Sequence, residues 1–318
     1  MPDPEPSRAA VALCCNAAHA PYAFCLADQV ARAHPGLAVV VASEDAVEPP
    51  APIPGLEVLR VPDNPFRGAL PPSRLGKGAC LRLLLPDLLG SRFRRLLYLD
   101  CDIVVERGGL DRLLRVPLHG APVGAVRDNL QWRTPGRRLP EHAAMGRPAR
   151  PYLNSGALLI DVDAWTAADL ANRCLRLLRD HPEAMVRHDQ SLLNVALDGG
   201  WAELSPVWNW QWSGPSRFFA DLAGARLYHF IGPRKPWNDR AAELPPRFRR
   251  LHAEWAAARY PDRPDLAPVD PEAPALPPGL AAAFLRHWWR ARATRAYLRR
   301  FPDPWTALPP LDAGRAAG

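Results

Sequence analysis

The first hundred residues alternate short apolar runs with segments of helical spacing, and this order limits the fold more than any other feature of the chain. The run at 9–15 (AAVALCC) is apolar throughout, which is typical of a strand buried on both faces of a parallel sheet. Strands that alternate with helices predict βαβ units. Ligands bind outside the carboxyl ends of such strands, so the residues that follow each strand are the first candidates for a functional site.

The same patterns predict the other elements of an α/β chain. Strands are expected at 9–15, 37–43, 56–61, 95–99, 123–127 and 157–162. Helices are expected at 22–34, 75–89, 164–180 and 245–260, and the first of them ends at the breaker pair Pro35-Gly36. The chain shows no internal repeat.

Length and proline content predict how the chain is divided. The 318 residues suffice for one α/β domain of about 250 residues plus an appendage. Many of the 38 prolines cluster near the N-terminus, at 49–72 and after residue 260. We therefore expect a globular domain at 1–260, a Pro-rich linker at 261–279 and a basic, aromatic helical tail at 280–318.

Cysteine usage and hydropathy predict a cytoplasmic protein. The six cysteines lie in apolar runs without zinc-type spacing, which indicates buried thiols in a reducing compartment. Residues 1–8 include Asp3 and Glu5 and no apolar stretch, so no signal peptide is expected. No run of about 18 apolar residues predicts a membrane span.

Two aspartates flank a cysteine where the fourth predicted strand ends, in the sequence Asp100-Cys101-Asp102. Because side chains alternate along a strand, the two carboxylates project to one side and Cys101 to the other. Such a pair suits a divalent cation that also binds water and a phosphate-bearing substrate. Mn²⁺ or Mg²⁺ is favoured over zinc, because no set of His and Cys surrounds the pair.

Two other interpretations of the acidic pair stay open. The aspartates can simply cap the following turn. The sequence D-x-D-x-V after a strand also resembles the nucleophile motif of haloacid dehalogenase-type phosphatases, with Asp100 phosphorylated and Asp102 as acid and base. That motif usually lies near the start of the chain, whereas here it begins at residue 100.

Five segments together resemble glycosyltransferase family eight in content, order and approximate spacing over roughly residues 9–260. They are LLYLDCDIVV, GAVRDN, YLNSGALLIDVDAW, HDQSLLN and HFIGPRKPW. The resemblance implies a Rossmann-like, nucleotide-binding mixed sheet, the glycosyltransferase A-type fold, with a C-terminal helical appendage. Residues 1–260 would then be the nucleotide-sugar-binding catalytic domain.

The resemblance also implies roles for individual residues. The metal ligands would be Asp100, Asp102 and His229. The catalytic, sugar-lining residues would be Asp128, Asn154, Asp189 and Gln190. The nucleotide-sugar donor would be held by Arg82, Gly232 and Lys235 together with the Asp100-Cys101-Asp102 segment. Lys235 would neutralise charge on the departing nucleotide, and Gly232 would let backbone amides approach the diphosphate.

The segment after the first strand departs from the family pattern. Family members usually carry an acidic residue, an Asn and an aromatic residue there, where this chain has Asn16, Ala18 and His19. The amide of Asn16 can still pair with a uracil edge, and His19 can stack on the base. Ala18 offers no hydrogen bond, so the base is less firmly predicted than the diphosphate.

The predicted function is metal-dependent, retaining transfer of a hexose, galactose or glucose, from a UDP-sugar. The acceptor would be a glycan or glycolipid such as lipopolysaccharide. The alternatives are a D-x-D aspartyl phosphatase and a non-catalytic nucleotide-sugar-binding module.

The tail at 280–301 interleaves arginines with aromatic residues and contains no Asp or Glu. This pattern is typical of a helix on an anionic membrane surface, which predicts peripheral association with the inner face of the plasma membrane. A helix docked on the catalytic domain is the alternative. No nucleic-acid partner is expected, since no recognition module accompanies the basic residues.

Overall fold

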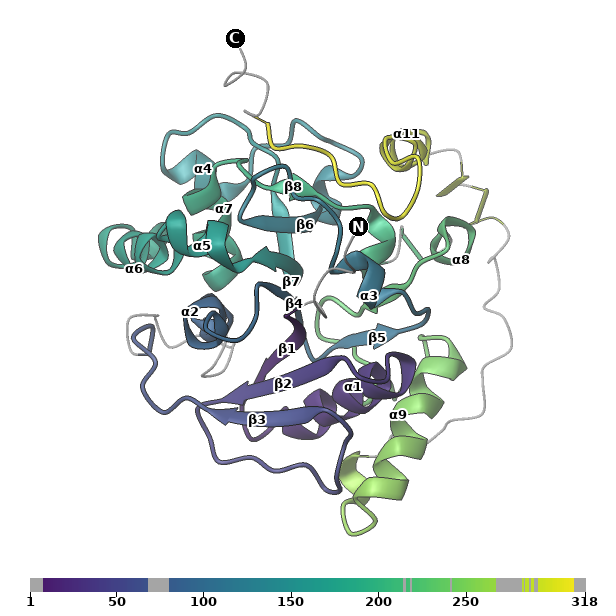
Figure 1. The fold of residues 1–318 in the computed structure, drawn as a ribbon. Helices are drawn as coiled ribbons and strands as arrows, with labels where there is room; N and C mark the ends of the chain where they lie inside the picture. The colour runs from purple at the N-terminus through teal and green to yellow at the C-terminus, as the bar shows by residue number, and fades with distance from the viewer. Residues whose placement is uncertain are drawn as a thin grey trace, which may run out of the picture.

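The computed structural model describes residues 8–67, 80–213, 216–217, 219–240, 242–266, 282, 284–285, 287–288 and 291–311. Within this part of the chain, a mixed sheet of seven strands runs in the order β3-β2-β1-β4-β7-β6-β8 (Figure 1). Its strands are β1 (Ala9–Cys15), β2 (Ala38–Ser43), β3 (Leu56–Arg60), β4 (Arg95–Leu99), β6 (Val123–Arg127), β7 (Leu153–Asp161) and β8 (Ala202–Glu203). Strands β1 to β4 are parallel, whereas β7 runs antiparallel between β4 and β6. The predicted α/β class with a mixed sheet is confirmed.

Helices cover both faces of this sheet. One face carries α1 (Ala20–Ala33) and α9 (Pro246–Arg259). The other carries α2 (Leu85–Leu89), α5 (Val162–Ala167), α6 (Leu170–Asp180) and α7 (His188–Leu197). Shorter helices are α3 (Leu110–Leu113), α4 (Pro140–Ala144), α8 (Ala220–Ala223) and α11 (Arg292–Leu298).

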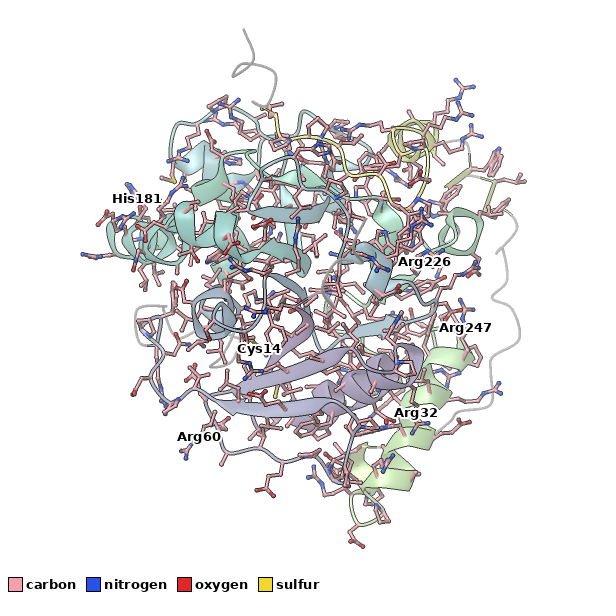
Figure 2. All side chains as sticks on the ribbon, in the orientation of Figure 1. Cys14, Arg32, Arg60, His181, Arg226 and Arg247 are labelled. Atoms are coloured by element: carbon pink, nitrogen blue, oxygen red, sulfur yellow. The ribbon has the colours of Figure 1, made fainter. Side chains whose placement is uncertain are left out.

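The two hydrophobic clusters explain why the first strand is apolar throughout. Val11 and Leu13 of β1 pack on the α1 side, while Ala10 and Ala12 pack on the α2 side. Figure 2 shows Cys14 inside the molecule and Arg60 and Arg247 at its periphery. All six cysteines are free thiols, and burial raises the pKa of Cys15 to about 12. The thiols therefore act as small hydrophobic side chains.

A second, small sheet lies beside the carboxyl end of β4. It consists of β5 (Ile103–Val105), β10 (Leu227–His229) and β9 (Trp210–Gln211), in the order β5-β10-β9. Strand β10 runs antiparallel to β5, with His229 opposite Ile103. Since Ile103 directly follows Asp102, this register brings His229 to the acidic pair.

Three predicted elements differ from the structure. The start of the helix expected at 75–89 lies outside the described residues, and the rest is a 3-10 turn at Leu81–Leu83 followed by α2. The helix expected at 164–180 is broken into α5 and α6, because Asp169 has a φ of +51°. The strand expected at 157–162 begins at Leu153, so Asn154 lies within β7.

The described part of the C-terminal tail packs on the α/β part of the chain. Tyr297 of α11 stacks on Trp132, with ring centroids 5.7 Å apart. Leu308 forms a β-bridge with Glu203, and the indole of Trp208 donates to the carbonyl of Pro304. Most of the linker and parts of the tail lie outside the described residues, and the division into 1–260, 261–279 and 280–318 stays a prediction. No helix among the described residues has the length and apolar character that crossing a membrane requires.

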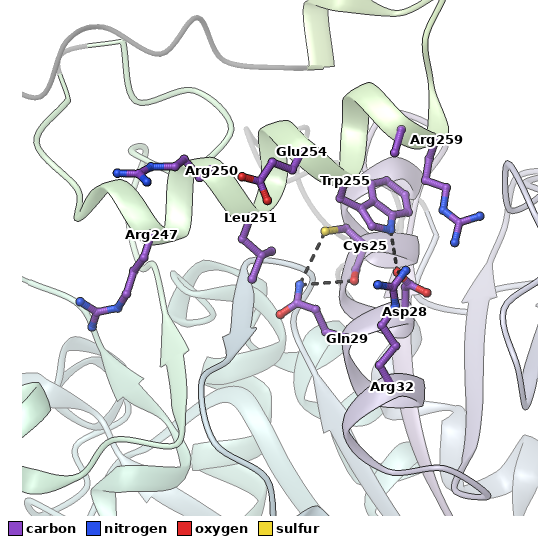
Figure 3. Close-up of a pocket in the computed structure, with 11 residues that line it drawn as sticks. Cys25, Asp28, Gln29, Arg32, Arg247, Arg250, Leu251, Glu254, Trp255 and Arg259 are labelled. Atoms are coloured by element: carbon purple, nitrogen blue, oxygen red, sulfur yellow. Dashed lines mark hydrogen bonds and ion pairs between the residues drawn. The ribbon is translucent and has the colours of Figure 1, made fainter.

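A groove of about 580 Å³ lies between α1 and α9 (Figure 3). Leu251 and Trp255 of α9 face Cys25 of α1 across it, and the Trp255 indole donates to Asp28 at 3.0 Å. Its lining includes none of the residues predicted for the site.

Candidate active site

Two aspartates and a histidine from separate elements meet at the carboxyl end of β4. Nε2 of His229 lies 3.3 Å from Oδ1 of Asp102 and 3.8 Å from Oδ2 of Asp100. Each of the three offers a ligand atom, and these atoms lie within 4.8 Å of one another. The structure therefore brings together the residues that the resemblance implies as metal ligands.

The donor set fits a divalent cation with a preference for oxygen ligands. Nδ1 of His229 hydrogen-bonds Oδ1 of Asn209 at 2.9 Å, so Nε2 is the nitrogen that faces the acids. Oδ1 of Asp102 is buried and accepts no hydrogen bond from any residue that the structure describes. A histidine held through its other nitrogen, beside two carboxylates, is the arrangement that metal sites use. Mn²⁺ and Mg²⁺ suit this set.

Gly156 makes room for the imidazole of His229. An added Cβ at Gly156 would lie 2.2 Å from Cε1 and 2.6 Å from Nδ1 of His229. Gly156 lies in β7, and the carbonyl of Gly156 accepts a hydrogen bond from the Asp100 amide at 2.8 Å. A side chain at this position would clash with the ring, so glycine is required where His229 lies as it does.

Lys235 provides a positive charge next to the metal group. Its ammonium pairs with Oδ2 of Asp102 and donates to the carbonyl of Phe230. Burial alone would raise the pKa of Asp102, but its contacts with His229 and Lys235 outweigh burial and lower it. Asp102 is therefore an anion, ready to bind a cation.

The loop that carries Lys235 is fixed at its far end by an aromatic stack. Trp237 lies flat on Tyr22 of α1, with ring centroids 3.9 Å apart and an interplanar angle of 8°. Gly232 lies at the exposed turn of this loop with a φ of +84°, a conformation that favours glycine.

Arg82 is buried beneath the acidic pair. Its guanidinium contacts Oδ1 of Asp100 at 2.9 Å and Oδ2 of Asp189 at 3.3 Å, and donates to the Ser155 carbonyl at 2.9 Å. It lies over the ring of Tyr98, whose hydroxyl donates to Asp100. Burial raises the pKa of Asp189, and the positive charge of Arg82 offsets part of this rise. Arg82 thus holds two of the predicted site carboxylates in place.

Three of the four sugar-lining residues implied by the resemblance, Asp128, Asn154 and Gln190, form one hydrogen-bonded network. Nε2 of Gln190 donates to Oδ2 of Asp128 at 3.1 Å. The amide of Asn154 lies 3.4 Å from the same oxygen and 3.3 Å from Oε1 of Gln190. Asn209 donates to Oδ1 of Asn154 at 2.8 Å. A continuous polar chain therefore links Asp128 to His229.

Asn16 and His19 lie at the carboxyl end of β1, on the same sheet edge as Asp100. Leu13 of β1 stands opposite Leu99 of β4 in the parallel register. Oδ1 of Asn16 accepts from the backbone amide of His19 at 3.0 Å and lies 2.8 Å from Nδ1 of the same residue. Cys101 packs against the hydrophobic cluster on the α1 side.

Two site residues were not predicted from the sequence, Asn209 and Gly156. Asn209 lies between the tryptophans of a W-N-W segment, a polar residue in an apolar run that could have been singled out. It is fully buried and bonds both His229 and Asn154.

The family model described as "Glycosyl transferase family 8" matches residues 72–241, more than half of the chain. The chain belongs to glycosyltransferase family 8. All five segments that carry the resemblance, including the D-x-D pair and Lys235, lie inside the matched range, whereas Asn16 and His19 lie outside it.

Three relatives of this family 8 chain share 29–30% of its residues over about half of its length or more. General stress protein A of Bacillus subtilis is 29% identical over 198 residues, covering 58% of this chain and 67% of that protein. The lipopolysaccharide 1,2-glucosyltransferase of Escherichia coli is 30% identical over 167 residues, covering 49% of this chain and 48% of that protein. The lipopolysaccharide 1,3-galactosyltransferase of Salmonella typhimurium is 29% identical with the same coverage. The chain thus spans about half the length of the two lipopolysaccharide enzymes.

Solved structures confirm the fold of this family 8 chain. An active-site mutant of LgtC superposes with a TM-score of 0.65 at 24% identity, over 80% of this chain and 99% of that chain. The galactosyltransferase LgtC in complex with donor and acceptor sugar analogs gives a TM-score of 0.62 at 22% identity, over 86% of this chain and 99% of that chain. The predicted glycosyltransferase A-type fold is therefore confirmed.

Proposed function

We propose that this family 8 chain transfers a hexose, galactose or glucose, from a UDP-sugar to a glycan or glycolipid acceptor, with retention of configuration. The observation that carries the proposal is the group of Asp100, Asp102 and His229 with Lys235 beside it. Two carboxylates, an imidazole and an ammonium at one sheet edge suit a diphosphate donor. The names of the lipopolysaccharide glucosyl- and galactosyltransferases support a lipopolysaccharide-type acceptor.

The diphosphate end of the donor would be held by the metal group and its loop. Mn²⁺ or Mg²⁺, when bound by Asp100, Asp102 and His229, supplies a Lewis acid for the diphosphate oxygens. Lys235 leaves Asp102 for the phosphate and neutralises the charge that develops on the leaving UDP. Gly232 lets the loop backbone approach the diphosphate.

The sugar end would lie on the network of Asp128, Asn154 and Gln190. Carboxylate and amide groups offer the acceptors and donors that sugar hydroxyls need. An orienting network of this kind fixes the anomeric carbon relative to the acceptor.

We infer front-face attack rather than a covalent glycosyl-enzyme. Gln190 is a poor nucleophile, and Arg82 pairs with the carboxylate of Asp189 inside the protein. The acceptor oxygen forms its bond to the anomeric carbon on the face from which the phosphate oxygen departs, and that oxygen accepts the acceptor's proton. An α-donor therefore gives an α-linked product; a β-linkage, read by NMR, would refute retention.

Assay of UDP release tests the proposed function. Incubation with UDP-galactose or UDP-glucose should release UDP slowly by hydrolysis, only with Mn²⁺ or Mg²⁺, and Asp102→Asn should abolish it. Tight UDP-sugar binding without turnover would instead indicate the non-catalytic module. An aspartyl-phosphate mimic trapped on Asp100 by beryllofluoride would indicate the phosphatase. Thermal-shift screening of nucleotide sugars with Mn²⁺ would rank them by their base, because Asn16 and His19 do not identify the base of the donor.

We also propose that the tail at 280–301 binds an anionic membrane surface, which would place the enzyme on the cytoplasmic face of the plasma membrane. Leu285 is 66% exposed and Trp288 41% exposed, and Leu222 of α8, at 72%, lies on a helix whose Phe219 stacks on Trp288. Arg286, Trp289 and Arg290 fall outside the described residues. Apolar side chains beside arginines suit an interfacial site.

Liposome flotation tests the membrane proposal with point variants, because deleting the tail would also remove the docked Tyr297. Leu285→Ser with Trp288→Ser should lower flotation on anionic vesicles, while Leu88→Ser, an exposed leucine of α2, should not. Equal flotation of wild type and the double variant would contradict the proposal.

A further inference from the structure

A buried glutamate joins the C-terminal tail to the sugar-side network. Glu203 of β8 accepts two hydrogen bonds from Arg127, from Nε at 2.9 Å and from Nη2 at 2.7 Å. It accepts two more from Arg300, which directly follows α11 and its C-cap, from Nη1 at 3.0 Å and from Nη2 at 2.9 Å. One carboxylate is thus held in a bidentate manner by two arginines, the strongest geometry that such pairs adopt.

The three residues differ in exposure. The side chains of Glu203 and Arg127 are 6% and 8% exposed, whereas that of Arg300 is 40% exposed. Arg300 therefore covers the buried pair from outside. The adjoining tail is fixed independently, because Leu308 exchanges two backbone hydrogen bonds with Glu203.

Arg127 directly precedes Asp128, whose backbone is held on both sides. The Arg127 carbonyl accepts from the Trp132 indole at 2.7 Å and from Nε2 of Gln211 at 3.0 Å. Oε1 of the same Gln211 accepts from the Asn129 amide at 2.8 Å. Trp132 in turn stacks on Tyr297 of α11. The tail thus contacts both the side chain of Arg127 and the ring that holds its carbonyl.

We propose that Arg300 is a positioning residue for the transfer reaction, which holds Asp128 in register with Gln190 and Asn154 through Glu203 and Arg127. The inference rests on the proposed function for its catalytic consequence. Loss of Arg300 leaves Glu203 with one cationic partner and lets the Arg127–Asp128 segment move, while the metal group at the other end of the network keeps its own contacts. Small displacements of sugar-binding groups lower the rate more than they weaken nucleotide binding.

Arg300→Ala tests this with Arg299→Ala as the matched control. Arg299 is the neighbouring exposed arginine and forms no ion pair with any residue that the structure describes. Both variants remove one charge from the tail, so an effect on membrane association would be the same. Arg300→Lys restores a single-point contact with Glu203 and should recover part of what Arg300→Ala loses.

Two readouts are measured on the full chain. For Arg300→Ala, kcat for sugar transfer or UDP release should fall about tenfold, with KM for the UDP-sugar changed less than about twofold. Hydrogen exchange of the 123–132 segment should accelerate, and that of β1 should stay as in wild type. Arg299→Ala should leave both readouts unchanged.

Each result decides the proposal. Equal behaviour of Arg300→Ala and Arg299→Ala in both readouts overturns it. Faster exchange at 123–132 with unchanged kcat also overturns it, because Arg300 would then be a purely structural contact. If wild type turns over no UDP-sugar, the proposed function fails, and exchange alone decides whether the tail fixes Asp128.

Discussion

The imidazole of His229 lies directly over the Cα position of Gly156, so closely that an alanine Cβ would lie 2.2 Å from its Cε1 atom. This contact joins two segments that are far apart in the sequence, β7 and β10. It places Nε2 of His229 against Asp102. The geometry of the candidate metal site therefore depends on a glycine that carries no chemistry of its own.

Gly156→Ala should displace His229 and weaken Mn²⁺ binding. The loss should be at least about tenfold in Kd, the size of effect seen when a ligand's orientation is disturbed. Calorimetric titration of Mn²⁺ in the presence of UDP measures it. Gly136→Ala, where an added Cβ meets nothing within 4 Å, is the control. Unchanged affinity in Gly156→Ala would show that His229 does not bind the metal.

Asn209→Ala should also weaken Mn²⁺ binding, by about 10- to 100-fold, because Nδ1 of His229 loses the partner that fixes the ring. The same titration measures the effect. Asn172→Ala removes an exposed asparagine that bonds Asp169 and should leave the affinity as in wild type. If Asn209→Ala binds Mn²⁺ as tightly as this control, His229 is oriented by other contacts.

Arg82→Met should destabilise the fold by about 3–5 kcal/mol, because it leaves the buried carboxylate of Asp189 and the partly buried carboxylate of Asp100 without their shared cation. Urea unfolding measures the free energy. Arg176→Met breaks an exposed pair with Asp169 and should cost much less, because solvent screens such a pair. Equal losses in the two variants would mean that Arg82 contributes no more than a surface arginine.

His252 should make stability depend on pH. It is buried against Trp237, and burial lowers its pKa to about 4. The unfolded chain, with a histidine pKa of about 6.5, binds the proton more readily, so stability is complete above that pH and falls as the pH drops towards 4. At pH 5 the loss from this group is about 2 kcal/mol.

Urea unfolding of wild type and His252→Leu at pH 7.5 and pH 5.0 tests this contribution. The difference in stability between the two pH values should be smaller in the variant, by about 2 kcal/mol. Because all other titrating groups are shared, the comparison isolates His252. The same pH dependence in both proteins would mean that His252 is protonated in the folded state.

Much of the sheet could be predicted because most of its strands are buried on both faces. Continuous apolar runs such as that of β1 identify a strand from composition alone, and five further strands were found in this way. The two-residue strands β8 and β9 carry too few residues for a periodic signal. The break between α5 and α6 at Asp169 depends on one backbone angle, which no pattern of apolar residues reveals.

The candidate site was predictable where residue types themselves carry chemistry. Asp100 and Asp102 follow from strand periodicity, whereas His229, well over a hundred residues away, came only from the resemblance. Gly156 was missed because its role is to leave room for the ring of His229, and the sequence does not show that the two residues meet. Asn209 was missed because an orienting residue needs the position of the residue that it orients.

The sequence did not decide whether the tail binds a membrane or docks on the domain, because arginines with aromatic residues suit both surfaces. Tyr297 and Arg300 face the domain, through Trp132 and Glu203. Leu285 and Trp288 stay exposed. One segment thus carries both patterns, which periodicity alone does not separate.

The central claim is that Asp100, Asp102 and His229 together hold one divalent cation that binds the diphosphate of the donor. Titration of UDP with and without Mn²⁺, into wild type and Asp102→Asn, tests it most directly. Mn²⁺ should raise the affinity of wild type for UDP at least about tenfold, or about 1.4 kcal/mol, and should leave that of Asp102→Asn unchanged. Equal UDP affinity of wild type with and without Mn²⁺ would contradict the claim.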